Sequence, residues 1–103
     1  MPIIFILVNA TLSARRMFDE AGMSLLRQSS YDILQLNHHD ATIHSHATGH
    51  DWIIVLNYQS SDCYILHRHS RKDPFHRQHG NYKSLEEAIR YINHHEKWVE
   101  AKH

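Results

Sequence analysis

The sequence predicts an α+β domain, on three observations. A run of short β-prone segments joined by turns fills the middle of the chain, a strong helix-start signal follows it, and 103 residues suit one folding unit. We expect an N-terminal strand and helix, an antiparallel meander of three to four strands, and a capped C-terminal helix packed on the sheet. Residues 1–103 then form one small domain, with residues 1–30 as a β-α element that is either integral or loosely attached.

The N-terminal element begins with the apolar run Ile3–Val8, whose Ile, Phe and Val residues favour a buried strand. A helix is expected to follow, because apolar residues recur at helical spacing at Ala14, Met17, Phe18, Ala21 and Leu25. Thr11 or Ser13 can cap its start, whereas Gly22 costs about 1 kcal/mol relative to alanine inside a helix.

Four strands are expected in the middle of the chain, namely Tyr31–Leu36, Ala41–Ala47, Trp52–Tyr58 and Cys63–His69. The connections between them are short and rich in turn residues, which favours antiparallel neighbours. The stretch Trp52–Leu56 is apolar on both faces and predicts a central strand covered on both sides. Ala41–Ala47 is more polar and predicts an edge strand.

The C-terminal helix has the clearest start signal. Ser84 followed by Glu87 is typical of a capping box. One narrow arc of the helix then holds Leu85, Ala88, Ile89, Ile92, Glu96 and Val99, which predicts that this side lies on the sheet. His94 lies opposite the arc and is expected to be exposed, whereas His95 lies at its margin and is expected to be packed and hydrogen-bonded.

Charge and cysteine content limit the functional classes. Eleven basic and eleven acidic residues give a net charge of zero, so nothing steers the whole chain toward nucleic acid or a membrane. The single cysteine, Cys63, has no internal disulfide partner, and a reducing cytoplasm is the simplest location. Ile3–Val8 is too short to span a bilayer, so no membrane contact is expected.

Twelve histidines are the chain's most unusual feature. Residues two apart in a strand share a face, so His44 points with His46, and His67 with His69. If the last hairpin turns at Ser60-Ser61, His67 lies opposite Ile54 and His69 opposite Trp52.

The loop before Trp52 decides whether the two histidine pairs meet. A loop of residues 48–51 sends the pairs to opposite faces, whereas a loop one residue shorter or longer brings them to one face, because a one-residue slip reverses every side chain. Even on one face, a central strand separates the pairs. A four-histidine zinc site is therefore geometrically awkward.

The favoured interpretation of the histidines is a set of solvated side chains without metal or cofactor, and three alternatives compete with it. A zinc site would use His67, His69, His76 and His79. A nuclease-like acid–base site would use His67, His69, His76 and Arg71. A nucleic-acid surface would use Arg68, Arg71, Lys72, Arg77 and Lys83.

The sequence therefore favours a small cytoplasmic interaction or regulatory module without catalytic activity. Its expected contact surface is the His- and Arg-rich end formed by Thr48–Asp51 and His67–His79. The expected partner is another protein of unknown identity, and an exposed edge strand would also permit a homodimer. Nucleic acid is the competing partner.

Overall fold

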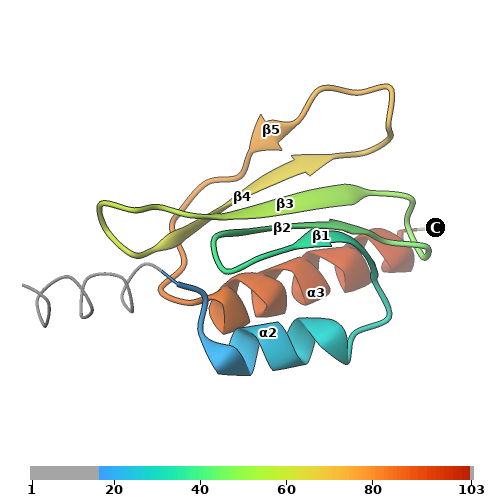
Figure 1. Cartoon of the computed structure of the whole chain (residues 1–103). Coiled ribbons are helices and arrows are strands. Elements are labelled where there is room, and N and C mark those ends of the chain that lie inside the picture. Colours follow the sequence, from blue (N-terminus) through green and yellow to red (C-terminus); the bar gives the residue numbers. More distant parts are fainter. Residues whose placement is uncertain (1–16, 103) are drawn as a thin grey trace, which may run out of the picture.

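The computed structural model describes residues 17–102. Its five-stranded antiparallel sheet has the order β1-β2-β3-β4-β5, in which each strand pairs with its neighbours along the chain. The strands are β1 (Asp32–Leu36), β2 (Asp40–His44), β3 (Asp51–Leu56), β4 (Cys63–Arg68) and β5 (His76–Arg77). Helices α2 (Glu20–Arg27) and α3 (Leu85–Ala101) lie on the same side of the sheet (Figure 1). The predicted α+β fold with a meander and a capped C-terminal helix is confirmed.

The core lies between the sheet and the two helices. Alternate residues of β4 are buried, as expected for a strand with one covered face. The buried residues of α3 are the predicted arc: Leu85, Ala88, Ile89, Ile92, Glu96 and Val99. We call the helix-covered side of the sheet the inner face and the other side the outer face.

The start of α2 differs from the prediction. Met17 and Phe18 precede the helix, and the Phe18 N–H donates to the carbonyl of His38 at 2.8 Å. Asp19 is the N-cap in place of Thr11 or Ser13, because its carboxylate accepts the Gly22 N–H at 2.9 Å. The predicted strand Ile3–Val8 and both predicted caps lie outside the described residues.

Asp19 also joins the two helices. Its second carboxylate oxygen accepts the N–H of Leu85, the first residue of α3, at 2.7 Å. Gly22 allows this close approach, since a Cβ there would lie 2.6 Å from the Leu85 Cβ and 2.6 Å from the Glu86 nitrogen. The glycine that weakens the isolated helix is therefore required where α2 crosses α3.

Two predictions about individual strands are corrected. β2 is not an edge strand: it lies between β1 and β3, because both neighbours form hairpins with it. The expected cover on both faces of β3 is not seen among residues 17–102, where Ile53 and Val55 on the outer face remain half-buried. The short β5 was not predicted.

The register of the last long hairpin also differs. His67 pairs with Trp52 and not with Ile54, because Leu56 pairs with Cys63 and the turn occupies the residues between them. The connection between β2 and β3 covers residues 45–50, longer than predicted. Both the predicted and the observed loop have an even number of residues, so the side chains face the same way in either case. His44 therefore faces outward and His67 inward.

Candidate metal centre

Three histidines meet at one end of the sheet. His50, His67 and His69 each offer a ring nitrogen, and these nitrogens all lie within 4.8 Å of one another. The pairing of Asp51 with Arg68 brings the preceding residue, His50, toward the following residue, His69. The rings of His50 and His69 are parallel within 5°, with their centroids 4.7 Å apart. We call these three residues the histidine cluster.

His67 is the buried member at the centre of the cluster. Its side chain is 4% exposed and its ring stacks on Trp52 at 3.8 Å between centroids. Burial, together with the neighbouring imidazoles, lowers the pKa of His67 to about 3. The ring is therefore neutral at pH 7, which is the protonation state that binds a metal ion.

A chain of hydrogen bonds fixes the orientation of His67. The Tyr91 hydroxyl donates to Gln78 Oε1 at 3.2 Å, which directs the Gln78 amide nitrogen to His67 Nδ1 at 3.3 Å. With Nδ1 accepting, His67 Nε2 carries the proton toward His50 Nδ1 at 2.8 Å. If the Gln78 amide were rotated by 180°, its Oε1 would accept a hydrogen bond from a protonated Nδ1. His67 Nε2 would then carry the lone pair and be free to bind a metal.

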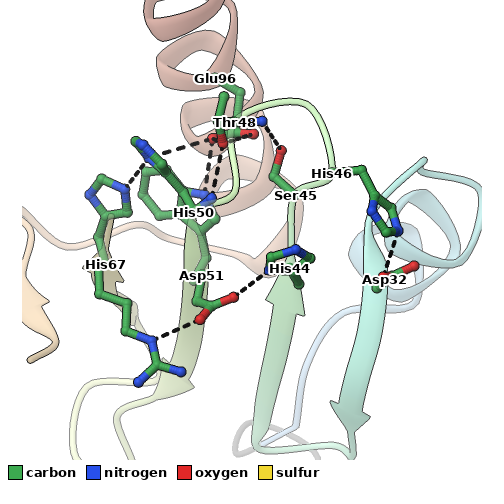
Figure 2. A network of polar contacts seen from close by, with 11 residues as sticks. Asp32, His44, Ser45, His46, Thr48, His50, Asp51, His67 and Glu96 are labelled. Carbon is green, nitrogen blue, oxygen red and sulfur yellow. Dashed lines mark hydrogen bonds and ion pairs between the residues drawn. The ribbon is translucent and has the colours of Figure 1, made fainter. Parts of the chain in front are cut away.

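A buried carboxylate lies beside the cluster (Figure 2). Glu96 is 5% exposed and accepts hydrogen bonds from Thr48 Oγ1 at 2.9 Å and Trp52 Nε1 at 3.3 Å. Its Oε2 lies 3.9 Å from His50 Nδ1. This negative charge favours a cation at the cluster, and it comes from the one acidic residue on the buried arc of α3.

The spacing between His50 and His67 is close to what zinc requires. Two nitrogens that each lie 2.0–2.1 Å from a tetrahedral zinc are about 3.3 Å apart. The 2.8 Å between His50 and His67 would therefore widen by roughly half an ångström on binding. His69 is exposed and can rotate into place. Three protein ligands would leave a fourth position open.

The structure brings together only part of the predicted zinc set. His67 and His69 lie in the cluster, but His76 pairs with His67 across β4 and β5 and is exposed. His79 is exposed in the loop after β5, where its carbonyl accepts the Tyr82 hydroxyl. Sequence reasoning missed His50 as a ligand because the predicted register did not bring it opposite His69.

The predicted catalytic set is likewise divided, since Arg71 lies in an exposed turn after β4. Two residues of the predicted nucleic-acid surface have partners at the sheet: the Arg68 guanidinium lies 4.3 Å from the Phe75 ring centroid, and that of Arg77 lies 4.5 Å from the Tyr64 centroid. The remaining members, Lys72 and Lys83, are exposed.

A second polar network lies on the outer face beside the cluster (Figure 2). Asp51 is 1% exposed, and its carboxylate accepts His44 Nδ1 at 2.6 Å and Arg68 Nε at 2.8 Å. Burial opposes ionisation of Asp51, but these hydrogen bonds and charges outweigh it and lower its pKa. The network joins β2, β3 and β4, as Asp51 pairs with both partner residues in the sheet.

The two histidines of α3 behave differently. His94 is exposed, as predicted. His95 is packed edge-on against Trp52 and His67, with centroids 5.2 and 5.1 Å away. Its buried Nδ1 has no hydrogen-bond partner among residues 17–102, so the predicted hydrogen bonding is not seen at that atom. Burial lowers the pKa of His95 as well.

No family model matches the chain, nor does any curated protein or solved structure. Within residues 17–102, neither helix is long and apolar enough to cross a membrane.

Proposed function

We propose that this protein is a metal-binding module that holds one first-row transition-metal ion, zinc foremost, at His50, His67 and His69. The observation that carries the proposal is the convergence of three ring nitrogens within 4.8 Å, with His50 and His67 both buried. Histidines that merely decorate a surface would be solvated and separate.

The surroundings support a cation at this place. Burial keeps the imidazole of His67 neutral, as a metal ligand must be, and Glu96 supplies negative charge 3.9 Å from His50. Gln78 lies behind His67, and with its amide rotated so that Oε1 accepts the Nδ1 proton it would hold Nε2 toward a metal, which is the usual role of a residue behind a metal-binding histidine. Imidazole ligands suit zinc, copper and nickel, and a set of three favours zinc with one open position.

A metal here would act on the fold itself. His50 precedes β3, whereas His67 and His69 lie in and directly after β4, so an ion would cross-link the ends of two paired strands. Metal occupancy would then stabilise the end of the sheet that carries Thr48–Asp51. This fits a regulatory or interaction role in the cytoplasm without catalysis, with the half-buried Ile53, Val55 and Leu66 of the outer face as contact residues.

The test is calorimetric titration of untagged, chelator-treated protein with zinc. We expect about one tight equivalent, lost in His50→Ala and weakened by more than 100-fold in His69→Ala, since even an outer partner is worth 10- to 100-fold. His94→Ala is the matched control, because His94 is exposed on α3. Equal zinc affinity in wild type and His69→Ala would overturn the proposal.

A further inference from the structure

The outer face of the sheet has no cover from the described part of the chain. Both helices, α2 and α3, lie on the inner side (Figure 1). The central side chains of the outer face, Ile53, Val55 and Leu66, are apolar and half-buried. They lie together, because Ile53 pairs with Leu66 and Val55 is two residues further along β3. An apolar sheet face of this kind is a candidate contact surface.

The two edges of the sheet are poorly suited to pairing with another strand. β1 carries an irregularity between Ile33 and Gln35, where its pairing with β2 shifts by one residue. β5 is two residues long. Bulges and short strands are among the usual means by which a sheet edge avoids pairing with another chain. A partner of this sheet is therefore expected on its face.

Charges on the outer face are divided between its two halves. Asp40 of β2 pairs with Val55 and points outward with it. Asp32 of β1 also points outward and is 49% exposed. On the other side of β3, the guanidinium of Arg77 lies 4.5 Å from the ring centroid of Tyr64. The β1–β2 half of the face is therefore acidic, and the β4–β5 half is basic.

We propose that the outer face binds a second copy of this chain, with the two-fold axis parallel to β3 and passing over it. Rotation about this axis places β2 of one copy over β4 of the other and β1 over β5, because the strands on either side of β3 exchange positions. The acidic half of each copy then covers the basic half of the other. An axis across the strands would instead place each strand over its own counterpart and set like charges together. The inference does not depend on a metal.

Asp40 and Arg77 form the contact that decides this arrangement. Asp40, Val55 and Tyr64 lie in one row across the sheet. Rotation keeps each row at its own height along the axis, so Asp40 of one copy lies over Tyr64 of the other, where the Arg77 guanidinium is held. Packed sheets lie about 10 Å apart, a distance that an aspartate and an arginine can span together. Ile53 and Val55 lie near the axis, which gives an apolar centre with a charged rim.

The buried carboxylate of β3 does not oppose this arrangement. Asp51 lies close to the proposed axis and would approach its own counterpart. Its carboxylate already accepts Arg68 Nε at 2.8 Å and His44 Nδ1 at 2.6 Å. Its negative charge is therefore compensated within each copy.

The face is small, so the dimer should be reversible. Five strands spaced about 4.8 Å apart give a width of roughly 19 Å, and the six residues of β3 give a length of about 20 Å. The resulting flat area of roughly 400 Å² is below the area of about 800 Å² that each partner buries in a standard interface. We therefore expect a dissociation constant in the micromolar range.

Analytical ultracentrifugation of the full chain, over a range of about 5 to 500 µM, tests the self-association. A chelator is present, so that association through a bridging metal is not counted. We expect a monomer–dimer equilibrium that Ile53→Glu weakens more than about tenfold, because it places two like charges near the axis. Lys97→Glu is the control and should leave the equilibrium unchanged, since Lys97 is exposed on α3. A chain that stays monomeric throughout, or a dimer insensitive to Ile53→Glu, would overturn the proposal and leave the metal centre standing.

Charge reversal tests the direction of the axis. Arg77→Glu and Asp40→Arg should each weaken self-association by about tenfold, because each homodimer then opposes like charges twice. An equimolar mixture of the two variants should associate within about threefold of wild type, since both contacts again pair opposite charges. Mixing cannot rescue a variant that fails to fold, so restoration separates a lost contact from a lost fold. A mixture that associates no better than either variant alone would overturn the arrangement.

Discussion

Acidification of the metal-free protein should destabilise it through His67. The folded-state pKa of His67 is about 3, well below the value of about 6.5 for an unfolded histidine. Between these values the unfolded chain binds a proton that the folded chain does not, so stability falls as the pH falls. Each pH unit costs about 1.4 kcal/mol, which amounts to about 2 kcal/mol between pH 6.5 and pH 5. Above pH 6.5 this contribution is fully present.

Urea unfolding at pH 7 and pH 5, followed by tryptophan fluorescence, measures this loss. His67→Gln should lose about 2 kcal/mol less than wild type between the two pH values, because glutamine does not titrate. His94→Gln should retain the wild-type loss, since His94 is exposed. The remaining loss in His67→Gln comes from groups such as His95, whose pKa burial also lowers. An identical pH dependence in His67→Gln and wild type would refute the reasoning.

Three substitutions test the packing that positions the site. Gly22→Ala should destabilise the protein by about 2 kcal/mol in urea unfolding, despite alanine's better helix propensity, because its Cβ would lie 2.6 Å from the Leu85 Cβ; a gain in stability would show that the helices do not cross as described. Glu96→Ala should cost about 3 kcal/mol by the same assay, since it leaves the Trp52 N–H and the Thr48 hydroxyl without their buried acceptor, and a loss under 1 kcal/mol would contradict that network. Ser84→Ala should lower the thermal midpoint by an amount equivalent to about 1 kcal/mol, because the Ser84 hydroxyl caps the Glu87 N–H; an unchanged midpoint would argue against the cap.

The C-terminal helix was predictable because its signals are local. The capping box is formed, with Ser84 accepting the Glu87 N–H at 3.1 Å, and the apolar arc is the buried side of α3. The same arc contained a clue to the site, since Glu96 was the one charged residue within it. A glutamate on a buried stripe needs buried donors, and Thr48 and Trp52 provide them.

The start of α2 was not predictable because its cap depends on a contact distant in sequence. Asp19 binds the N–H of Leu85, 66 residues away, in addition to capping its own helix. Apolar spacing continues upstream through Met17 and Phe18, so the pattern alone extends the helix too far. The requirement for Gly22 has the same origin, because only the packed structure brings Leu85 against it.

The histidine cluster was missed because it depends on strand register. The turn after β3 contains Ser61 at a positive φ of 64°. Serine seldom adopts this conformation, so the sequence of the turn does not predict it. The resulting shift moves His69 beyond the end of β4, where it stacks on His50. The sequence left open whether His44 and His67 share a face, and the observed six-residue loop, even-numbered like the four-residue one, puts them on opposite faces.

The most direct measurement is X-ray absorption fine structure of the zinc-loaded protein, which counts the ligands and their distances. The proposed centre predicts three imidazole nitrogens at about 2.0 to 2.1 Å with one further light-atom ligand. His94→Ala should give the same spectrum, and His69→Ala should lose one imidazole. A spectrum with fewer than three imidazoles in the wild type, or one unchanged in His69→Ala, would contradict a metal centre at His50, His67 and His69.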